Sequence, residues 1–105
     1  MPVFVVISRH SPENCPLFNE KTRKVWVNFL SRFDGLTKKH GIKNLGVWSA
    51  GNIHQTMMVM EAPSFEALTK CLMEPEALSI GMVETAEINH VFSGEEVLKM
   101  LQQAK

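Results

Sequence analysis

The chain has 105 residues, of which 45% are hydrophobic and 21% charged, and its formal net charge is zero. This length fits a single domain spanning residues 1–105, and this composition excludes a disordered chain. Residues 1–52 carry eight basic and three acidic side chains, whereas residues 53–105 carry three basic and eight acidic ones. Because the two halves cancel, no nucleic-acid or membrane partner is expected. This uneven distribution of charge indicates either a solvated basic helix face or charge complementarity between the two halves, within one chain or across a dimer.

No apolar run approaches the ~20 residues of a membrane span, and the first residues lack the cationic start of a signal peptide. The two cysteines, Cys15 and Cys71, are too few for a disulfide scaffold and form no Cys-x-x-Cys pair. We therefore expect reduced cysteines and a cytoplasmic protein.

The first half of the chain predicts a strand, a polar loop and a long helix. Residues 3–8 are apolar on both faces, which is typical of a central strand, and residues 9–16 contain two prolines among polar side chains. From residue 17 to residue 40 the apolar side chains recur with helical spacing. We expect Asn14 or Cys15 to cap this helix and Gly41 to end it.

The second half predicts three strands and two further helical segments. Residues 45–49 and 54–61 read as a hairpin joined by a turn at 50–53. A helix follows from Ser64 to about residue 73, with a short helical turn at 76–80.

Residues 83–92 form the last predicted strand. Ser93 and Glu96 then make a capping box that opens a terminal helix through about residue 101. The order β-α-β-β-α-β plus a terminal helix predicts an α+β, ferredoxin-like fold with an antiparallel sheet and the first strand in its middle.

One face of such a sheet carries the helices, and the other must be wet or covered. Here the strands supply apolar residues to both faces, notably in the runs 3–7 and 57–60. A large exposed apolar patch usually marks an interface. We therefore predict a homodimer in which two sheets pack face to face, and Met58→Asp is expected to give monomers or insoluble protein.

The whole chain resembles the dimeric α/β-barrel superfamily. The resemblance rests on the order of the elements, the length near 100 residues, the loop entering the first helix and the segment from Phe65 to Glu76. The loop from His10 to Pro16 resembles an uncharacterised small-protein branch of it. The resemblance implies dimerisation into an α/β barrel. It also suggests monooxygenase-like or isomerase-like chemistry without an organic cofactor. Fold membership alone does not decide between an enzyme and a binding protein.

His10 and His54 are the leading candidate metal ligands. His10 follows the first strand and His54 begins the third, so antiparallel pairing should bring them together. With Cys15 or Glu13 from the adjoining loop they would suit a divalent metal such as zinc. In that case their nitrogens should lie within about 4 Å of each other, each ~2.1 Å from the ion. The alternative is a pair of loop histidines making ordinary hydrogen bonds.

Other residues are candidates for chemistry or ligand binding. Cys15 at a helix start, beside Arg9 and with His10 as base, could act as a nucleophile. His90 could be a base if its strand face lines the space between two sheets, where Trp48 would also lie. Each could equally be a packing residue.

Arg23 and Asn19, one turn apart on the first helix, could orient an anionic ligand or simply form an exposed helical pair. The strand methionines could line a pocket for flat apolar molecules.

Three functions follow. The first is a homodimer that binds or transforms a small hydrophobic or anionic molecule in an inter-sheet or strand-end pocket. Its closed cavity should contain Trp48 or His90. The second is a metal-binding protein that uses His10 and His54. The third is a non-catalytic assembly or stress protein.

Overall fold

Four antiparallel strands form one sheet in the order β2-β3-β1-β4. The computed structural model describes residues 1–104. The elements are β1 (Val3–Arg9), η1 (Pro12–Asn14), α1 (Glu20–Lys39), β2 (Lys43–Ala50), η2 (Gly51–Ile53), β3 (Gln55–Glu61), α2 (Phe65–Leu72), α3 (Pro75–Gly81), β4 (Thr85–Val91) and α4 (Gly94–Gln103). The α+β, ferredoxin-like fold with a C-terminal helix is thereby confirmed, with β1 between β3 and β4.

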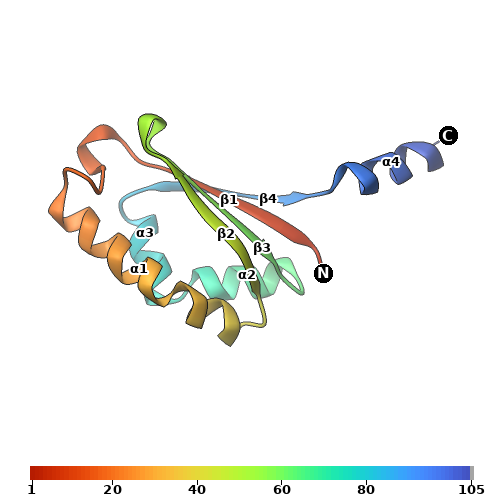
Figure 1. Ribbon diagram of the computed structural model, residues 1–105. Helices are drawn as coiled ribbons and strands as arrows, with labels where there is room; N and C mark the ends of the chain where they lie inside the picture. Colours follow the sequence, from red (N-terminus) through yellow and green to blue (C-terminus); the bar gives the residue numbers. More distant parts are fainter. Residues whose placement is uncertain (105) are drawn as a thin grey trace.

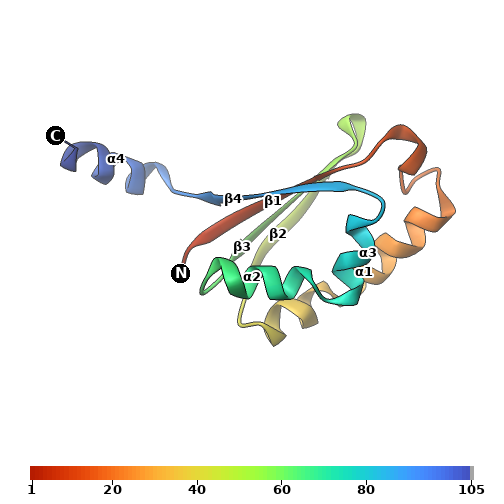
Figure 2. The same ribbon diagram turned by 180° about the vertical axis from the view of Figure 1, so that it is seen from behind.

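Helices α1, α2 and α3 cover one face of the sheet (Figures 1 and 2). Alternate residues of β1, namely Phe4, Val6 and Ser8, are buried on this face. The helix α1 contributes an aromatic row in which the Phe29 ring centroid lies 5.7 Å from that of Trp26 and 5.0 Å from that of Phe33. Buried residues of α2 and α3 complete the hydrophobic core, which therefore lies between the sheet and all three helices.

The opposite face of the sheet is not covered by these helices (Figure 1). In β1 and β3 the residues that alternate with the buried set are only partly buried or exposed. They include Val5, Ile7, Met57 and Val59, and Trp48 of β2 pairs with Met57 on the same face. We call these five residues the open face. Met58 lies on the helix face and is 3% exposed, so Met58→Asp would place a charge in the hydrophobic core instead of on the open face. Strand alternation makes Met57 the matching exposed position.

The helix α1 begins three residues later than the sequence indicated. Its N-cap is Asn19, whose side chain accepts a hydrogen bond from the Thr22 amide at 3.0 Å. The prediction that Asn14 or Cys15 caps α1 was wrong. The chain first makes the turn η1, and the amides of Phe18 and Asn19 then bond to the Cys15 carbonyl. Gly41 follows α1 with a φ of +68°, as expected for a glycine that ends a helix.

The terminal helix α4 projects away from the body of the chain (Figures 1 and 2). None of its residues is buried. The radius of gyration is 15.3 Å, larger than the ~13 Å of a compact chain of this length, because α4 extends the long axis. In the described part of the chain, no helix is long and apolar enough to cross a bilayer.

Candidate functional site

Strand register brings His10 and His54 together at one end of the sheet. The last pair between β1 and β3 is Arg9 with Gln55, so the next residues outward are His10 and His54. The His10 amide donates to the His54 carbonyl at 3.1 Å, and Nε2 of His10 lies 3.2 Å from Nδ1 of His54. The expected convergence of the two histidines is confirmed. Two nitrogens bound tetrahedrally to one ion at ~2.1 Å would lie about 3.4 Å apart, close to this separation.

The backbone of His54 is left-handed, with a φ of 52°, and it is the only non-glycine residue with positive φ among residues 1–104. It closes the turn η2, where its amide donates to the Gly51 carbonyl. This conformation costs an ordinary residue roughly 1 kcal/mol and is free for glycine. Histidine is, with asparagine and aspartate, among the non-glycine residues that adopt this region more often than others.

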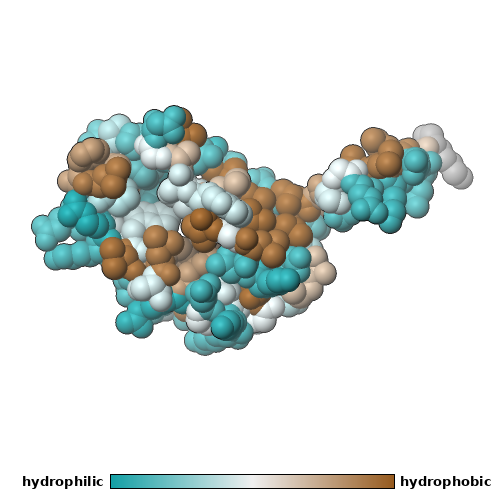
Figure 3. All heavy atoms as spheres, viewed as in Figure 1, coloured by the Kyte–Doolittle hydropathy of each residue, from teal (hydrophilic) through white to brown (hydrophobic). Residues whose placement is uncertain are grey.

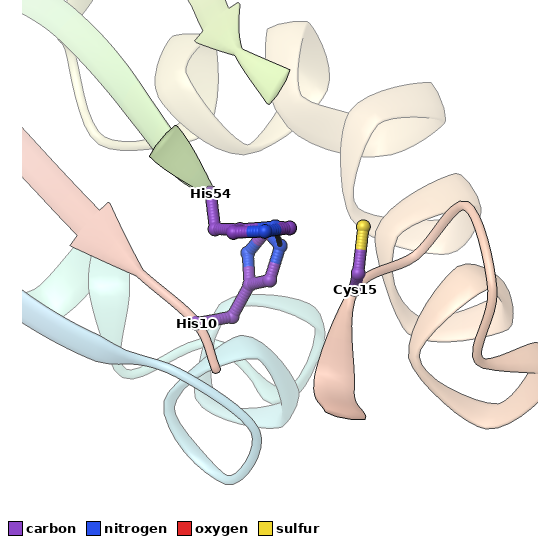
Figure 4. Close-up of side chains that lie close together, drawn as sticks. All are labelled: His10, Cys15 and His54. Atoms are coloured by element: carbon purple, nitrogen blue, oxygen red, sulfur yellow. Dashed lines mark hydrogen bonds between the residues drawn. The ribbon is translucent and has the colours of Figure 1, made fainter. Parts of the chain in front are cut away.

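Cys15 completes the cluster from the loop between β1 and α1. Ligand atoms of His10, Cys15 and His54 all lie within 4.8 Å of one another. Figure 4 shows the two imidazole rings meeting, with the Cys15 side chain beside them. Cys15 is 3% exposed, whereas Glu13, the other loop candidate, is exposed and outside the cluster. A hydrogen bond with the Ser11 side chain holds the pKa of Glu13 below its usual value.

A buried carboxylate, Glu84, stands behind His10. Its Oε1 lies 3.6 Å from Nδ1 of His10, on the side of the ring away from His54. Its Oε2 accepts a hydrogen bond from the indole N–H of Trp26. Neither Oε1 nor Nδ1 has a hydrogen-bond partner among residues 1–104, so a small approach would pair them. A carboxylate in this position favours the proton on Nδ1. Nε2, which is hydrogen-bonded to Nδ1 of His54, is then the nitrogen whose lone pair could bind a metal ion.

Glu84 was missed by sequence reasoning, although a signal was present. The last pair between β1 and β4 is Arg9 with Thr85. The next position outward pairs His10 with Glu84, by the same register rule that pairs His10 with His54. The start of the fourth strand therefore lies beside the end of the first strand, as the start of the third strand does.

A pocket of about 410 Å³ opens beside the cluster, between α1, the loop and the ends of β2 and β3. Its apolar lining comes from Pro16, Leu17, Trp26, Val27, Leu30 and Val47, and its polar lining from His10, Arg23, Ser49 and Thr56. A smaller cavity of about 170 Å³ touches both His10 and Cys15. His10 is thus the one residue of the cluster that also lines the larger pocket.

Arg23 and Asn19 both hold the loop that carries Cys15. Arg23 donates from Nε to the Pro16 carbonyl at 3.0 Å and from Nη2 to the Leu17 carbonyl at 2.9 Å. Asn19 donates to the Glu13 carbonyl at 2.9 Å while it caps α1. Arg23 lines the large pocket and Asn19 is not among its lining residues. Of this predicted pair, only Arg23 is in a position to meet a ligand there.

Trp48 and His90 lie on opposite faces of the sheet. Trp48 is on the open face, 55% exposed, with its ring over Gly46, where any side chain would collide with it. His90 pairs with Phe4 on the helix face, and its ring lies 5.0 Å from Phe4 and 4.5 Å from Phe92. His90 was expected to act as a base only if its strand face lined the space between two sheets, and it lies on the helix face instead. Neither Trp48 nor His90 lines the 410 Å³ pocket. The pocket lies at the strand ends instead.

Cys15 does not lie at the start of α1, which was one basis for the hypothesis that it acts as a nucleophile. Cys15 lies four residues before the N-cap of α1, so the helix terminus does not favour its thiolate in the way we expected. The second cysteine, Cys71, is 1% exposed in the core. Burial, with a contribution from the charge of Glu74, raises the pKa of its thiol to about 11.

Comparisons with known proteins bear on the fold. No protein-family model matches the chain, and no curated protein matches it. Among solved structures, the chain is similar to an uncharacterised NIPSNAP domain protein from Burkholderia xenovorans. The TM-score is 0.53 at 10% sequence identity, over 90% of this chain and 96% of that one. At this identity the likeness supports the ferredoxin-like fold and carries no function across.

Proposed function

We propose that His10, His54 and Cys15 form a zinc-type metal centre. The observation that carries this proposal is the convergence of three ligand atoms of the kinds zinc prefers within 4.8 Å. They come from three separate places in the chain: the end of β1, the start of β3 and the loop before α1. Side chains this far apart in sequence meet in a partly buried cluster only because the sheet register and the loop both place them there.

The arrangement behind these ligands supports the same proposal. Metal-bound histidines usually give their second nitrogen to a carboxylate or carbonyl. Glu84 occupies that place for His10, where it would hold the proton on Nδ1 and direct Nε2 to the ion. The left-handed backbone of His54 directs the other imidazole inward at a conformational cost that a purely structural turn would avoid.

Three protein ligands leave one position of a tetrahedral ion open, which is the arrangement of a catalytic rather than a structural zinc site. The large pocket begins at His10. We propose that the protein binds or transforms a small molecule in this strand-end pocket, without an organic cofactor and with the metal beside the bound molecule. Because a zinc-binding thiolate must stay reduced, a cytoplasmic location would suit this site.

The test compares zinc binding by the wild type, His54→Gly and a matched control, His90→Gln. Glycine removes the imidazole and relieves the left-handed backbone, so the metal-free variant should be at least as stable as the wild type. We expect one zinc per wild-type and His90→Gln chain after dialysis, and none retained by His54→Gly. The measurement is elemental analysis, with a chromophoric chelator competing for the metal.

Equal zinc retention by His54→Gly and the wild type would contradict the metal centre. So would a wild-type chain that takes up no zinc, cobalt or nickel under reducing conditions. Cobalt also gives an independent readout, since thiolate coordination by Cys15 should add an intense near-ultraviolet absorption band that Cys15→Ser loses.

We further propose that the open face packs against the open face of a second copy. Its residues Val5, Ile7, Trp48, Met57 and Val59 form an uncharged apolar patch across three neighbouring strands. An apolar patch can pack on a copy of itself, because a two-fold interface needs a self-complementary surface. The charged side chains beside it on the same face, Arg9 and Glu87, pair with each other at 3.8 Å. Light scattering should give twice the chain mass for the wild type and the chain mass for Met57→Asp. A monomeric wild type at 100 µM would contradict this pairing.

A further inference from the structure

The charge and the apolar surface of the strand-end pocket together indicate which molecules it takes. This inference rests on the proposed small-molecule function but not on the metal. Leu17, Val27 and Leu30 line the pocket while 50–69% of their surface remains exposed. Covering this apolar surface with an apolar ligand removes it from water, which favours binding. The pocket therefore favours an apolar molecular body.

Most polar groups of this pocket already have a partner. The hydroxyls of Ser49 and Thr56 bond to each other at 2.8 Å across β2 and β3. His10 faces His54 and Glu84. These side chains do not require a polar group from a ligand.

Arg23 is the exception. Its guanidinium uses Nε and Nη2 to hold two carbonyls of the loop, which fixes its position without neutralising its charge. A guanidinium has five N–H groups, so three remain. Within the described residues 1–104, Arg23 forms no ion pair with a carboxylate. Arg23 is exposed, so this guanidinium, held by two backbone carbonyls beside an apolar pocket, is accessible to an anionic group of a ligand.

We propose that the pocket binds a small amphipathic acid. Its apolar body lies against Val27, Leu30 and Val47, and its single anionic group meets Arg23. The volume of about 410 Å³ is within the ~300–1,000 Å³ typical of sites for small molecules. A zwitterion, a sugar or a polyanion would leave polar groups unpaired against the apolar wall.

The test uses pairs of probes that differ only in charge. Octanoate and octanol compete against the fluorescence of bound N-phenyl-1-naphthylamine, a neutral apolar dye. We expect octanoate to displace the dye at a concentration at least tenfold lower than octanol, because only the acid can form a charge-assisted hydrogen bond with Arg23. Arg23→Gln should abolish this preference while octanol binding stays. Arg23→Lys keeps the charge without the fork that holds the loop, and it should retain part of the preference.

Equal displacement by the acid and the alcohol would overturn the proposal. The proposal would also be overturned if neither Arg23→Gln nor Arg23→Lys bound either probe. Arg23 would then only support the loop. Each measurement is repeated after chelation. An acid preference that survives in a chain that binds no metal would refute the metal centre and leave this inference standing. Zinc binding without any acid preference would do the reverse.

A second inference comes from α4, independently of the pocket. Figure 3 shows hydrophobic atoms gathered on one side of the projecting helix. Val97, Leu98, Met100 and Leu101 are 39–67% exposed. The capping box at Ser93 specifies where the helix begins. However, isolated helices shorter than ~12–15 residues are marginal in water, and α4 has 10 residues. This helix therefore requires a surface to pack on.

We propose that α4 is an arm that packs on a second copy of the chain. It follows β4, an edge strand of the sheet whose open face we assign to the dimer. Only two residues, Phe92 and Ser93, separate the strand from the helix. This short tether keeps α4 next to any copy seated on the open face. Its first turn carries Glu95 and Glu96, which suits the basic first half of a second chain.

Leu98→Glu tests the arm, with Lys99→Gln on the same helix as control. We expect at least a tenfold weaker dimer by light scattering for Leu98→Glu and an unchanged one for Lys99→Gln. A wild-type dimer that Leu98→Glu leaves unchanged would overturn the arm but not the open-face pairing. A dimer that tolerates Met57→Asp but not Leu98→Glu would overturn the open-face pairing and keep the arm. A wild type that stays monomeric overturns both.

Discussion

Replacing Glu84 by glutamine should weaken zinc binding even though Glu84 is not a ligand. In the wild type one oxygen accepts from Trp26 and the other faces Nδ1 of His10 at 3.6 Å. Glutamine keeps one acceptor for the indole and places an amide N–H₂ group toward His10. That group donates to Nδ1 and so favours the tautomer with its proton on Nε2, the atom that should bind the metal.

Loss of such an outer carboxylate typically costs about 10–100-fold in metal affinity, or ~1.4–2.7 kcal/mol. The assay is competition with a chromophoric chelator at pH 7.5. Glu87→Gln is the matched control, because Glu87 is an exposed acid on β4 that contacts Arg9 at 3.8 Å. An unchanged zinc affinity in Glu84→Gln would refute this reasoning. An equal loss of zinc affinity in both variants would show that the effect of Glu84 is only a long-range effect of its charge. Urea unfolding of the metal-free variants checks that both are folded.

The remaining predictions concern stability and reactivity. Hydrogen bonds from Lys39 at 2.8 Å and His40 at 2.9 Å hold the pKa of Glu74 below its ordinary 4.5. Glu74 therefore stabilises the fold above about pH 4.5, and the difference in unfolding free energy between the wild type and Glu74→Gln should vanish as the pH falls below that value. Cys71, with its thiol pKa raised to about 11 by burial, should resist a disulfide reagent at pH 8 until the chain is unfolded; rapid labelling of the native protein would contradict its burial. Phe29→Ala should cost about 3–5 kcal/mol in urea unfolding, because Phe29 is 1% exposed between two aromatic rings; a cost below 1 kcal/mol would show that the core adapts.

The fold could be predicted because its signals are local or periodic. The continuous apolar, β-branched run in β1 and the period near 3.6 in α1 each indicate their element without reference to the rest of the chain. The capping box at Ser93 and the glycine after α1 mark helix ends by their own chemistry. The N-terminus of α1 was misplaced because Leu17 and Phe18, which continue the apolar spacing of the helix, precede its true N-cap, Asn19. Only the folded loop shows which side chain accepts the amide.

Half of the candidate site followed from topology. Antiparallel pairing of the first and third strands placed His10 beside His54, because the end of one strand meets the start of the other. The same rule applied to the first and fourth strands would have found Glu84. The choice between Cys15 and Glu13 could not be made in this way, since both lie in one irregular loop whose path depends on Arg23 and Asn19.

The sequence by itself determined the order of the elements, the central place of β1, the apolar character of both sheet faces and the meeting of His10 with His54. These depend on backbone periodicity and strand pairing, which neighbouring residues largely dictate. Only the tertiary structure decided that Met57 rather than Met58 lies on the open face, that the pocket lies at the strand ends, and that Glu84 stands behind His10. These depend on exact strand boundaries and on side chains brought together from distant parts of the chain, because a shift of one residue along a strand moves its side chain to the other face.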